Sequence, residues 1–367
     1  MHLKRLKITQ FKNYEEADLT FSEMLNCFTG LNGVGKTNLL DAIHFLCLCK
    51  SHQSLLDGEL MRRGSDFFRV EGYFERDERD EKIIVKLAAG KRKIFERNGN
   101  TYPKLSEHIG LLPVVMICPD DVALAKEGSE YRRKFLDNTI SQYDRGYLNA
   151  LLTYTKILEQ RNALLKSERF SEALLAIYDT QLVEPARIVC EGRAALVAEL
   201  SVLFNAYYAR ISGDREAVAC RYDSQLLTQN MSDILASRRE KDRVLQRTTG
   251  GVHRDELTFI IHDVSLKKFG SQGQLKSFVI ALKLAQHALL RQHSGMQPIL
   301  LLDDFFDKLD EQRVTNVLSL LVDMQFGQLF LTDTSSDRIQ SVLKHLPQLD
   351  TKLWQVENGI ISPTLPY

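Results

Sequence analysis

The chain has 367 residues, which is long for a single domain and favours two packed lobes. Its 48 Lys and Arg residues balance its 48 Asp and Glu residues, which excludes a protein that coats nucleic acid by bulk electrostatic attraction. No apolar run is long enough for a membrane-spanning helix, and residues 1–4 begin a strand rather than a signal peptide. We therefore expect a cytoplasmic protein without a membrane partner.

The first element that indicates a chemistry is the loop at residues 30–37, which fits the phosphate-binding pattern G-x-x-x-x-G-K-[ST]. A short apolar strand at residues 27–29 precedes it, and a helix-spaced apolar run at residues 38–48 follows. In such a strand–loop–helix unit the backbone N–H groups face the phosphates, Lys36 reaches the β- and γ-phosphates, and Thr37 places its hydroxyl on Mg²⁺. The expected nucleotide contacts are Gly30, Leu31, Asn32, Gly33, Val34, Gly35, Lys36, Thr37 and Asn38.

Strand patterns follow this helix. Residues 67–75 and 82–87 predict an antiparallel pair, residues 94–102 contain an Asn-Gly hairpin signal, and residues 113–118 predict one more apolar strand.

Because the net charge is zero, any contact with nucleic-acid phosphates must come from local basic clusters. The candidate clusters are residues 91–93, 132–134, 238–247 and 267–268.

A helical pattern then extends from about residue 131 to residue 211. Alternating steps of three and four predict a short coiled-coil-like seam at Leu148, Leu151, Thr155, Leu158, Asn162 and Leu165. The partner helices are expected to be interrupted near Pro185. A strand at residues 217–222 and a charged helix follow. The pattern predicts an α/β fold: a head domain with a mixed sheet at residues 1–118 and 245–367, and an inserted helical lobe at residues 119–244.

The sequence Gly-Ser-Gln-Gly-Gln at residues 270–274 precedes an apolar helical run that starts at Leu275. It resembles the signature motif of ABC-type ATPases, a second anion site formed by a serine hydroxyl and free N–H groups. The resemblance implies that Ser271, Gly273 and Gln274 face the γ-phosphate of ATP held by another subunit, in a head-to-tail dimer. The alternative is an ordinary helix capped by Ser271. The position between two other ATPase motifs favours the first interpretation.

Two carboxylates end the apolar run at residues 298–304, which is typical of a buried parallel strand. Ligands of such sheets lie at the carboxyl ends of the strands. Asp303 is therefore the expected partner of Mg²⁺, directly or through water, and Asp304 is placed to orient or deprotonate the attacking water. The expected catalytic residues are Lys36, Asp304 and Ser271.

Residues 328–334 predict another buried strand with a polar end. ABC transporters and SMC proteins usually carry a histidine at this switch position. Here the candidates for sensing the γ-phosphate are Thr332, Asp333 and Thr334, and Thr332 is the expected nucleotide contact. We therefore expect slow hydrolysis, as in a switch rather than a motor.

Further blocks are similar to the RecF family of bacterial recombination-mediator ATPases, along nearly the whole chain. They are residues 3–14, 50–52, 119–121, 132–137 and 251–257. Val252 stands where the family usually has proline, and residues 307–310 read Asp-Lys-Leu-Asp where Ser-Glu-Leu-Asp is commoner. The roles of Asp307, Lys308 and Asp333 are therefore open. The Q-loop residue is not identified, although residues 118–121 occupy its usual place in SMC-type proteins.

The resemblance implies an ATP-dependent DNA clamp with weak, DNA-stimulated ATPase activity and Mg²⁺ as cofactor. It also implies roles in replication and recombinational repair, namely recombinase loading at gaps in DNA and induction of the SOS response. The implied partners are duplex, gapped or junction DNA, a second copy of the chain, and proteins of the RecO and RecR type.

Two other functions are considered. One is an SMC-like or Rad50-like ATPase that works with a nuclease, but the helical lobe is too short for a long coiled coil or a zinc hook. The other is a small-molecule kinase with the same phosphate loop, which would not need the signature motif.

Three local questions stay open in the sequence. The six cysteines lie mostly in apolar contexts without a C-x-x-C pair, so we expect buried thiols rather than a metal cluster of Cys47 and Cys49 with His44 and His52. Arg254 could stabilise phosphate charge or pair with Asp255, and the pairing is favoured. His52 could lie near the nucleotide or on a surface turn.

Overall fold

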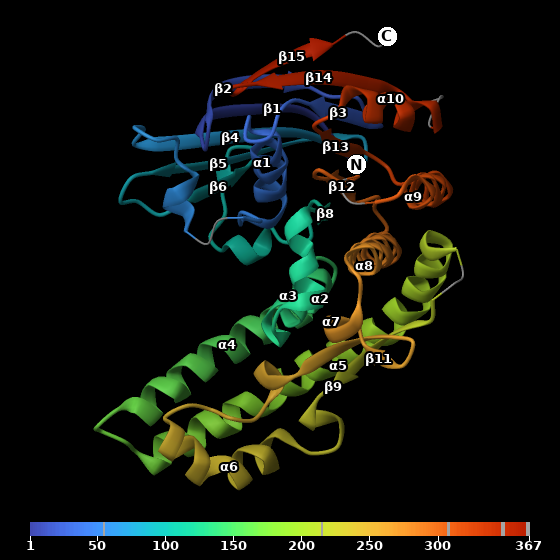
Figure 1. Cartoon of the computed structure of the whole chain (residues 1–367). Coiled ribbons are helices and arrows are strands. Elements are labelled where there is room, and N and C mark those ends of the chain that lie inside the picture. The colour runs from blue at the N-terminus through green and yellow to red at the C-terminus, as the bar shows by residue number, and fades with distance from the viewer. Residues whose placement is uncertain (54–55, 214–215, 307–308, 346–348, 365–367) are drawn as a thin grey trace. The chain divides into compact units, whose positions relative to one another are not determined.

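The computed structural model describes residues 1–53, 56–213, 216–306, 309–345 and 349–364 (Figure 1). The chain divides into two compact units. The first unit consists of Met1–Asp121, Arg210–Ser212 and Lys276–Tyr367, and the second of Val122–Ala209 and Gly213–Leu275. The division of the sequence into a head domain at residues 1–118 and 245–367 and a lobe at residues 119–244 stays a prediction.

Two six-stranded sheets form the framework of the first unit. One is antiparallel with the strand order β2-β1-β4-β5-β6-β7, and the other has the order β15-β14-β3-β13-β12-β8. In the second sheet all neighbouring strands are parallel except β14 and β15. The strands are β1 (His2–Phe11), β2 (Tyr14–Thr20), β3 (Leu25–Thr29), β4 (Phe67–Arg76), β5 (Arg79–Ala88), β6 (Ile94–Arg97), β7 (Asn100–Thr101), β8 (Val114–Ile117), β12 (Ile299–Leu302), β13 (Leu329–Asp333), β14 (Thr351–Glu357) and β15 (Ile360–Thr364).

The strand predictions for this unit are confirmed. β4 and β5 pair antiparallel as expected, and β6 and β7 form the hairpin around the Asn-Gly turn. The apolar runs before the phosphate-binding loop, after residue 113 and before Asp303 are the buried strands β3, β8 and β12. The parallel register of the second sheet therefore brings the carboxyl ends of β3, β13, β12 and β8 to one edge.

The main helices of the first unit are α1 (Lys36–Leu48), α9 (Glu311–Met324) and α10 (Ser336–His345), together with most of α8 (Gln272–Ser294). Helix α1 is buried along nearly its whole length and contacts strands of both sheets, so it joins them into one hydrophobic core. Among the described residues, no helix is long and apolar enough to cross a membrane.

A buried glutamine also connects the two sheets. Gln328, just before β13, accepts a hydrogen bond from the backbone N–H of Leu3 (2.7 Å) and donates one back to the Leu3 carbonyl (2.9 Å). Its amide also donates to the carbonyl of Ser22 (2.8 Å). These bonds satisfy polar groups that would otherwise be unpaired in the core, and they fix β1 beside the start of β13.

The second unit is mainly helical and contains one small sheet. Its helices are α2 (Ala123–Lys126), α3 (Ser129–Ile140), α4 (Arg145–Lys166), α5 (Glu172–Ser212), α6 (Met231–Leu245) and α7 (Leu266–Phe269). The sheet has the order β11-β10-β9, with β9 (Val218–Asp223), β10 (Glu256–Ile261) and β11 (Val264–Ser265). Helices α4 and α5 form an antiparallel pair, since Tyr147 packs on Gly192 and Arg161 pairs with Asp179.

The predicted seam of α4 is confirmed at its two ends and wrong in its middle. Leu148 and Leu165 are buried as predicted, but the predicted Thr155 is exposed, and the residues buried between the ends are Ala150, Tyr154, Ile157, Arg161 and Leu164. The reason is that this core accepts polar side chains that have charged or hydrogen-bonding partners, although Nη2 of Arg161 is buried without a partner among the described residues. Tyr154 bonds the His253 ring (2.7 Å), and the Arg161 guanidinium pairs with Asp179 (2.7 Å) and Asp242 (2.8 Å).

The predicted interruption at Pro185 is wrong. Helix α5 extends without a break over 41 residues with Pro185 inside it. Proline in a helix interior costs roughly 3 kcal/mol, but Leu182, Ala186 and Val189 on its two sides are all fully buried. Burial of such apolar side chains contributes roughly 1.5–3 kcal/mol for each larger residue, so packing outweighs the lost hydrogen bond.

Candidate functional site

The phosphate-binding loop connects β3 to α1 through three glycines with positive φ angles. These are 156° at Gly30, 81° at Gly33 and 118° at Gly35. A side chain at Gly35 would also place its Cβ 2.3 Å from Nδ2 of Asn13, so this position excludes other residues on two grounds. The loop backbone is thereby held in a shape that ordinary residues do not adopt.

Asn13, in the turn between β1 and β2, and Tyr14, the first residue of β2, hold the loop from outside. The Asn13 amide donates to the Val34 carbonyl (2.9 Å) and its oxygen accepts from Nδ2 of Asn38 (2.7 Å), while the Tyr14 hydroxyl donates to the Gly35 carbonyl (2.9 Å). The sequence identified Asn38 as a nucleotide contact, but it assigned no role to Asn13 or Tyr14. The only signal in the sequence for a role of these two residues was that both lie within residues 3–14, one of the blocks that carry the family resemblance.

Lys36 is almost fully buried, with 4 % of its surface exposed. Its ammonium donates to the carbonyls of Gly30 (2.8 Å) and Leu31 (3.0 Å), at the opening of the loop. The cation therefore lies inside the loop and not in solvent. In contrast, the side chain of Leu31 is 77 % exposed.

The carboxylate of Asp303 is the meeting point of three segments. It accepts hydrogen bonds from the Thr37 hydroxyl (2.8 Å) at the start of α1 and from the Thr332 hydroxyl (2.8 Å) on β13. Burial raises the pKa of Asp303, and the two hydroxyls oppose that shift. Hydroxyl and carboxylate oxygens are the hard donors that Mg²⁺ prefers, so the residues present fit this ion.

Asp304 lies next to this cluster with an unusual backbone. Its φ is 39°, and its N–H donates to the Thr332 hydroxyl (3.0 Å). Within the described structure, Oδ1 of Asp304 is buried and has no hydrogen-bond partner. A buried carboxylate oxygen without a partner is costly, so its retention indicates a group that is satisfied by a ligand or water.

The switch strand ends in a charged pair. Asp333 accepts from the backbone N–H of Ser335 (2.7 Å), and its carboxylate lies 3.3 Å from Nε of Arg338 on α10. Burial raises the pKa of Asp333, and the Arg338 cation opposes the shift. Arg338 also donates to the Thr334 hydroxyl (3.3 Å). Thr332 and Thr334 thus have different partners, and Thr332 alone of the two contacts the Asp303 cluster.

The signature residues lie at the start of α8, in the second unit. Ser271 Oγ accepts from the N–H of Gln274 (3.2 Å), and the Gln274 side chain accepts from the N–H of Ser271 (2.8 Å). This reciprocal pair is a capping box. Gln274 also donates to Glu216 (2.9 Å), and Gly273 is partly exposed. The exposed Ser271 thus caps the helix, as expected if the motif is the start of an ordinary capped helix. It also stays accessible from solvent.

Between the acidic strand and α9, Asp307 and Lys308 lie outside the described residues. Asp310 is described, and its side chain caps α9 by accepting from the N–H of Arg313 (2.9 Å). The side chain of Asp310 has a structural role at this position.

One basic cluster is engaged in structural bonds. Arg132 donates to Glu256 (2.7 Å), Arg133 donates to a backbone carbonyl (2.7 Å), and Lys134 pairs with Glu130 (2.7 Å). Arg132 and Arg133 therefore fasten α3 to the small sheet rather than project into solvent.

The predicted pairing of Arg254 with Asp255 is wrong. The Asp255 carboxylate accepts from Arg193 (2.9 Å) on α5 and from the Tyr222 hydroxyl (2.5 Å). Arg254 instead approaches the Thr248 carbonyl (3.4 Å). Arg193 was missed because its partner is 62 residues away in the chain.

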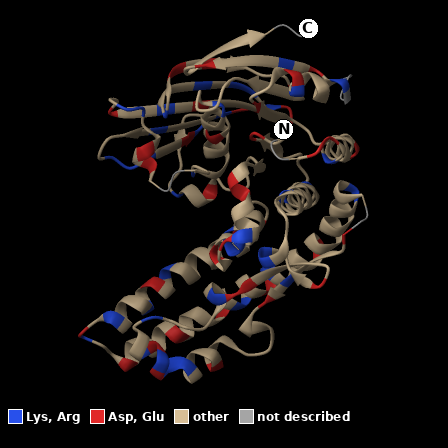
Figure 2. Ribbon diagram, in the orientation of Figure 1, with Lys and Arg blue, Asp and Glu red and all other residues tan. Residues whose placement is uncertain are grey.

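The other basic clusters are mixed with acidic residues (Figure 2). On α6, Arg239 pairs with Asp179 (2.9 Å) and Arg243 with Glu172 (3.1 Å). Lys91 and Arg92, between β5 and β6, are exposed. Exposed cations remain in all three clusters, including Lys267 and Lys268 on α7, so all three remain candidates for contact with phosphates.

Comparison with known proteins agrees with this geometry. The family model described as RecF/RecN/SMC N terminal domain matches residues 2–351. A DNA replication and repair protein RecF of Flavobacterium johnsoniae is 44% identical over 95% of this chain and 98% of its own length. One of Parabacteroides distasonis is 44% identical over 99% of both chains.

Solved structures lead to the same family. A structure of the recombination mediator protein RecF-ATP in the RecFOR pathway is 28% identical, with a TM-score of 0.89 over 99% of this chain and 98% of that one. An Smc head domain from Pyrococcus furiosus has a TM-score of 0.58 at 16% identity over 99% of this chain and 96% of its own, which shows a shared fold.

The loop geometry leads to a prediction about two glycines. Gly35→Ala is expected to destabilise the protein more than Gly33→Ala. A left-handed backbone costs an alanine roughly 1–2 kcal/mol at either site. Only at Gly35 would the new Cβ meet Asn13, whereas nothing lies within 4 Å of the Cβ at Gly33. Such overpacking adds roughly 1–3 kcal/mol.

Urea denaturation of the two variants without added ligand measures this difference in the free energy of unfolding. Because Asn13 is the clashing group, Asn13→Ala combined with Gly35→Ala should cost less than the sum of the single changes. Equal losses at Gly33 and Gly35 would contradict the packing role of Asn13.

Proposed function

Because the chain belongs to the RecF family of DNA replication and repair proteins, we propose that it is an ATP-dependent DNA clamp with slow, DNA-stimulated ATPase activity. The observation that carries this proposal is the convergence of Thr37, Thr332 and the phosphate-binding loop on Asp303. The family's ATP-bound structures support ATP as the nucleotide.

In the proposed site the loop and the start of α1 hold the phosphates. The backbone N–H groups of residues 30–38 face them, and the Lys36 ammonium exchanges its loop carbonyls for β- and γ-phosphate oxygens. Thr37 and Asp303 hold Mg²⁺, which neutralises charge on the phosphates when it is bound. The ATPase domain comprises residues 1–118 and 245–367, and residues 119–244 are the inserted lobe.

Asp304 is proposed to position the attacking water. Its buried, unpartnered Oδ1 supports this role, since a water can satisfy it. The Thr332 hydroxyl bonds both the Asp304 N–H and the Asp303 carboxylate, so it would sense changes at either group. A threonine offers the γ-phosphate a neutral hydroxyl instead of the histidine found in faster relatives. This supports slow turnover.

The active form is proposed to be a head-to-tail dimer. Ser271, Gly273 and Gln274 of one copy would complete the site of the other, and the accessible Ser271 hydroxyl supports this. Dimerisation would join weak basic patches of two copies into one groove for duplex, gapped or junction DNA, so ATP would control DNA binding by avidity.

The biological role proposed is recombinase loading at DNA gaps and SOS induction in the cytoplasm, with partners of the RecO and RecR type. The description of related structures as recombination mediators in the RecFOR pathway supports this role.

The nucleotide site can be tested with Lys36→Ala and Asp304→Asn. Loss of charged hydrogen bonds costs roughly 1.5–3 kcal/mol, so Lys36→Ala should weaken ATP binding roughly 10- to 100-fold. Asp304→Asn should keep ATP binding but lower the hydrolysis rate by roughly 10²–10⁴-fold, the usual contribution of a general base.

Fluorescent-nucleotide titration and phosphate release measure the two effects. Lys156→Ala, an exposed lysine on α4, is the matched control and should change neither. Unaltered ATP affinity in Lys36→Ala, with the fold intact by circular dichroism, would refute the proposed site.

The shared site can be tested by mixing subunits. Lys36→Ala removes a loop contact and Ser271→Arg blocks the signature contact, so each variant alone should be inactive. In a mixed dimer one of the two pockets is intact, and part of the hydrolysis should return. Phosphate release across mixing ratios provides the measurement. No recovery at any ratio would count against sites shared between subunits.

A further inference from the structure

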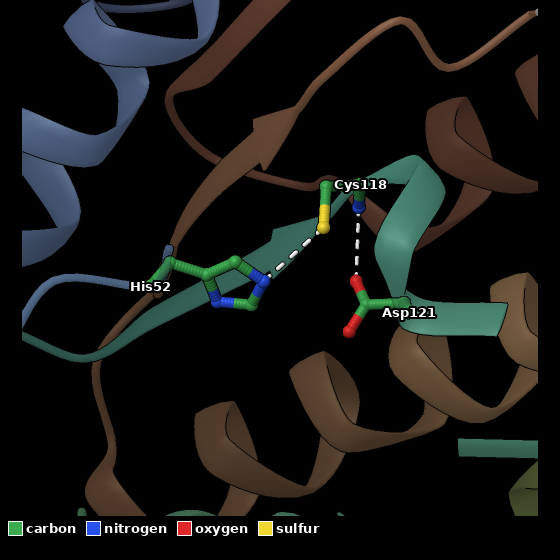
Figure 3. Close-up of side chains that lie close together, drawn as sticks. All are labelled: His52, Cys118 and Asp121. Carbon is green, nitrogen blue, oxygen red and sulfur yellow. Dashed lines mark hydrogen bonds between the residues drawn. The ribbon is translucent and has the colours of Figure 1, made fainter. Parts of the chain in front are cut away.

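Three side chains with metal-binding chemistry converge in the first unit, and none of them belongs to the Thr37–Asp303–Thr332 cluster (Figure 3). His52 follows α1, Cys118 follows β8, and Asp121 lies in the short 3-10 helix η3 (Pro119–Val122). Nε2 of His52 lies 3.1 Å from Sγ of Cys118. One ligand atom of each residue lies within 4.8 Å of the other two.

The donor set indicates the class of ion. An imidazole nitrogen, a thiolate sulfur and a carboxylate oxygen together suit Zn²⁺, which is commonly bound by His, Cys and Asp. Mg²⁺ and Ca²⁺ prefer sites built from oxygen alone, so this set differs from the one at Thr37 and Asp303.

His52 is held in place by further contacts, and the backbone of Cys118 is bonded to the Asp121 carboxylate. The backbone N–H of His52 donates to Oδ1 of Asp41 (2.6 Å), and Oδ2 of Asp121 accepts from the backbone N–H of Cys118 (2.9 Å). The ring of His44 packs edge-on against His52, with ring centroids 5.3 Å apart. Metal ligands fixed by such outer contacts lose little conformational freedom on binding.

The charges around the three groups allow a cation. Asp41, Asp120 and Asp121 all act electrostatically on His52, and Lys283 opposes them. Lys12 neutralises Asp41 in a close ion pair (2.6 Å), which leaves two carboxylates against one ammonium.

We propose that His52, Cys118 and Asp121 bind one Zn²⁺ ion, with a water as the fourth ligand of a tetrahedral site. On binding, the Cys118 thiol releases its proton to solvent and the sulfur bonds the ion, so one proton leaves for each ion bound. The site does not depend on the proposed ATPase activity.

The position of this site gives the ion a structural effect on the acidic strand. Cys118 directly follows β8, and the preceding Ile117 accepts a hydrogen bond from the Asp303 N–H (2.8 Å). An ion on Cys118 would therefore tie the segment after α1 to the strand that borders Asp303.

Lys283 is the natural competitor of the ion. Its ammonium lies 2.7 Å from Oδ1 of Asp121, and Oδ2 accepts from the Cys118 N–H, so the ion must displace Lys283 from the carboxylate. Lys283→Met keeps much of the side chain's length and removes its charge. It should tighten metal binding roughly tenfold or more, because removing a positive charge near the ion changes the binding free energy by about the equivalent of one pKa unit.

The test is a Co²⁺ titration of the full reduced chain without nucleotide, because a Co²⁺–thiolate bond gives a charge-transfer absorption that His and carboxylate ligands do not. One equivalent of Co²⁺ should produce the band, and Zn²⁺ should abolish it. Cys118→Ser should lack the band. The control Cys49→Ser, which removes another buried cysteine of the same unit, should keep it.

His52→Gln leaves the thiol in place and provides a second variant if Cys118→Ser does not fold. It should weaken Co²⁺ binding by at least the roughly 10–100-fold that loss of an outer-shell contact costs. The absence of a thiolate band in the unmodified chain would overturn the proposal. An undiminished band in folded Cys118→Ser would also overturn it, because the ion would then be bound by another cysteine.

Discussion

The buried carboxylate of Asp303 is the interaction on which the candidate site depends. With 3 % of its surface exposed it has lost most of its water, and burial disfavours its charged form. The described structure compensates with hydroxyls of Thr37 and Thr332, which come from a helix and a strand far apart in the sequence. These contacts require β12 and β13 to end, and α1 to begin, at one edge of the sheet, and the parallel register supplies that edge.

Thr332 extends this constraint to the neighbouring acid. Its hydroxyl donates to Asp303 and accepts from the N–H of Asp304, whose backbone is in the left-handed region. A change of charge at Asp303 would therefore affect the Asp304 backbone through the side chain of Thr332. In the proposed function this link couples the Mg²⁺-binding carboxylate to the one that positions water, with a neutral hydroxyl in the place of the usual histidine.

The local motifs could be predicted from the sequence because their chemistry lies in consecutive residues. The phosphate-binding loop, the acidic strand and the switch strand are found where their patterns indicate. Features made by distant residues were not predicted. Asn13 supports the loop from another turn, and Asp255 pairs with Arg193 rather than with its neighbour in sequence.

Two errors have the same physical origin, namely a core that does not follow apolar periodicity. The stripe of α4 includes Arg161, whose buried charge is paired with Asp179 and Asp242, so a search for apolar residues alone selects the adjacent stripe. Pro185 is tolerated because both sides of α5 are packed. The cluster of His52 and Cys118 was also invisible, because its members lie 66 residues apart.

The most direct test of the account is the oligomeric state in solution, measured by light scattering with ATP, with ADP, and with ATP plus duplex DNA. Asp304→Asn is the suitable variant, because slow hydrolysis preserves the ATP state. The account predicts a dimer that forms with ATP, dissociates with ADP and is reinforced by DNA. A monomer under all three conditions would contradict it, since the signature residues of one copy would then have no nucleotide to face.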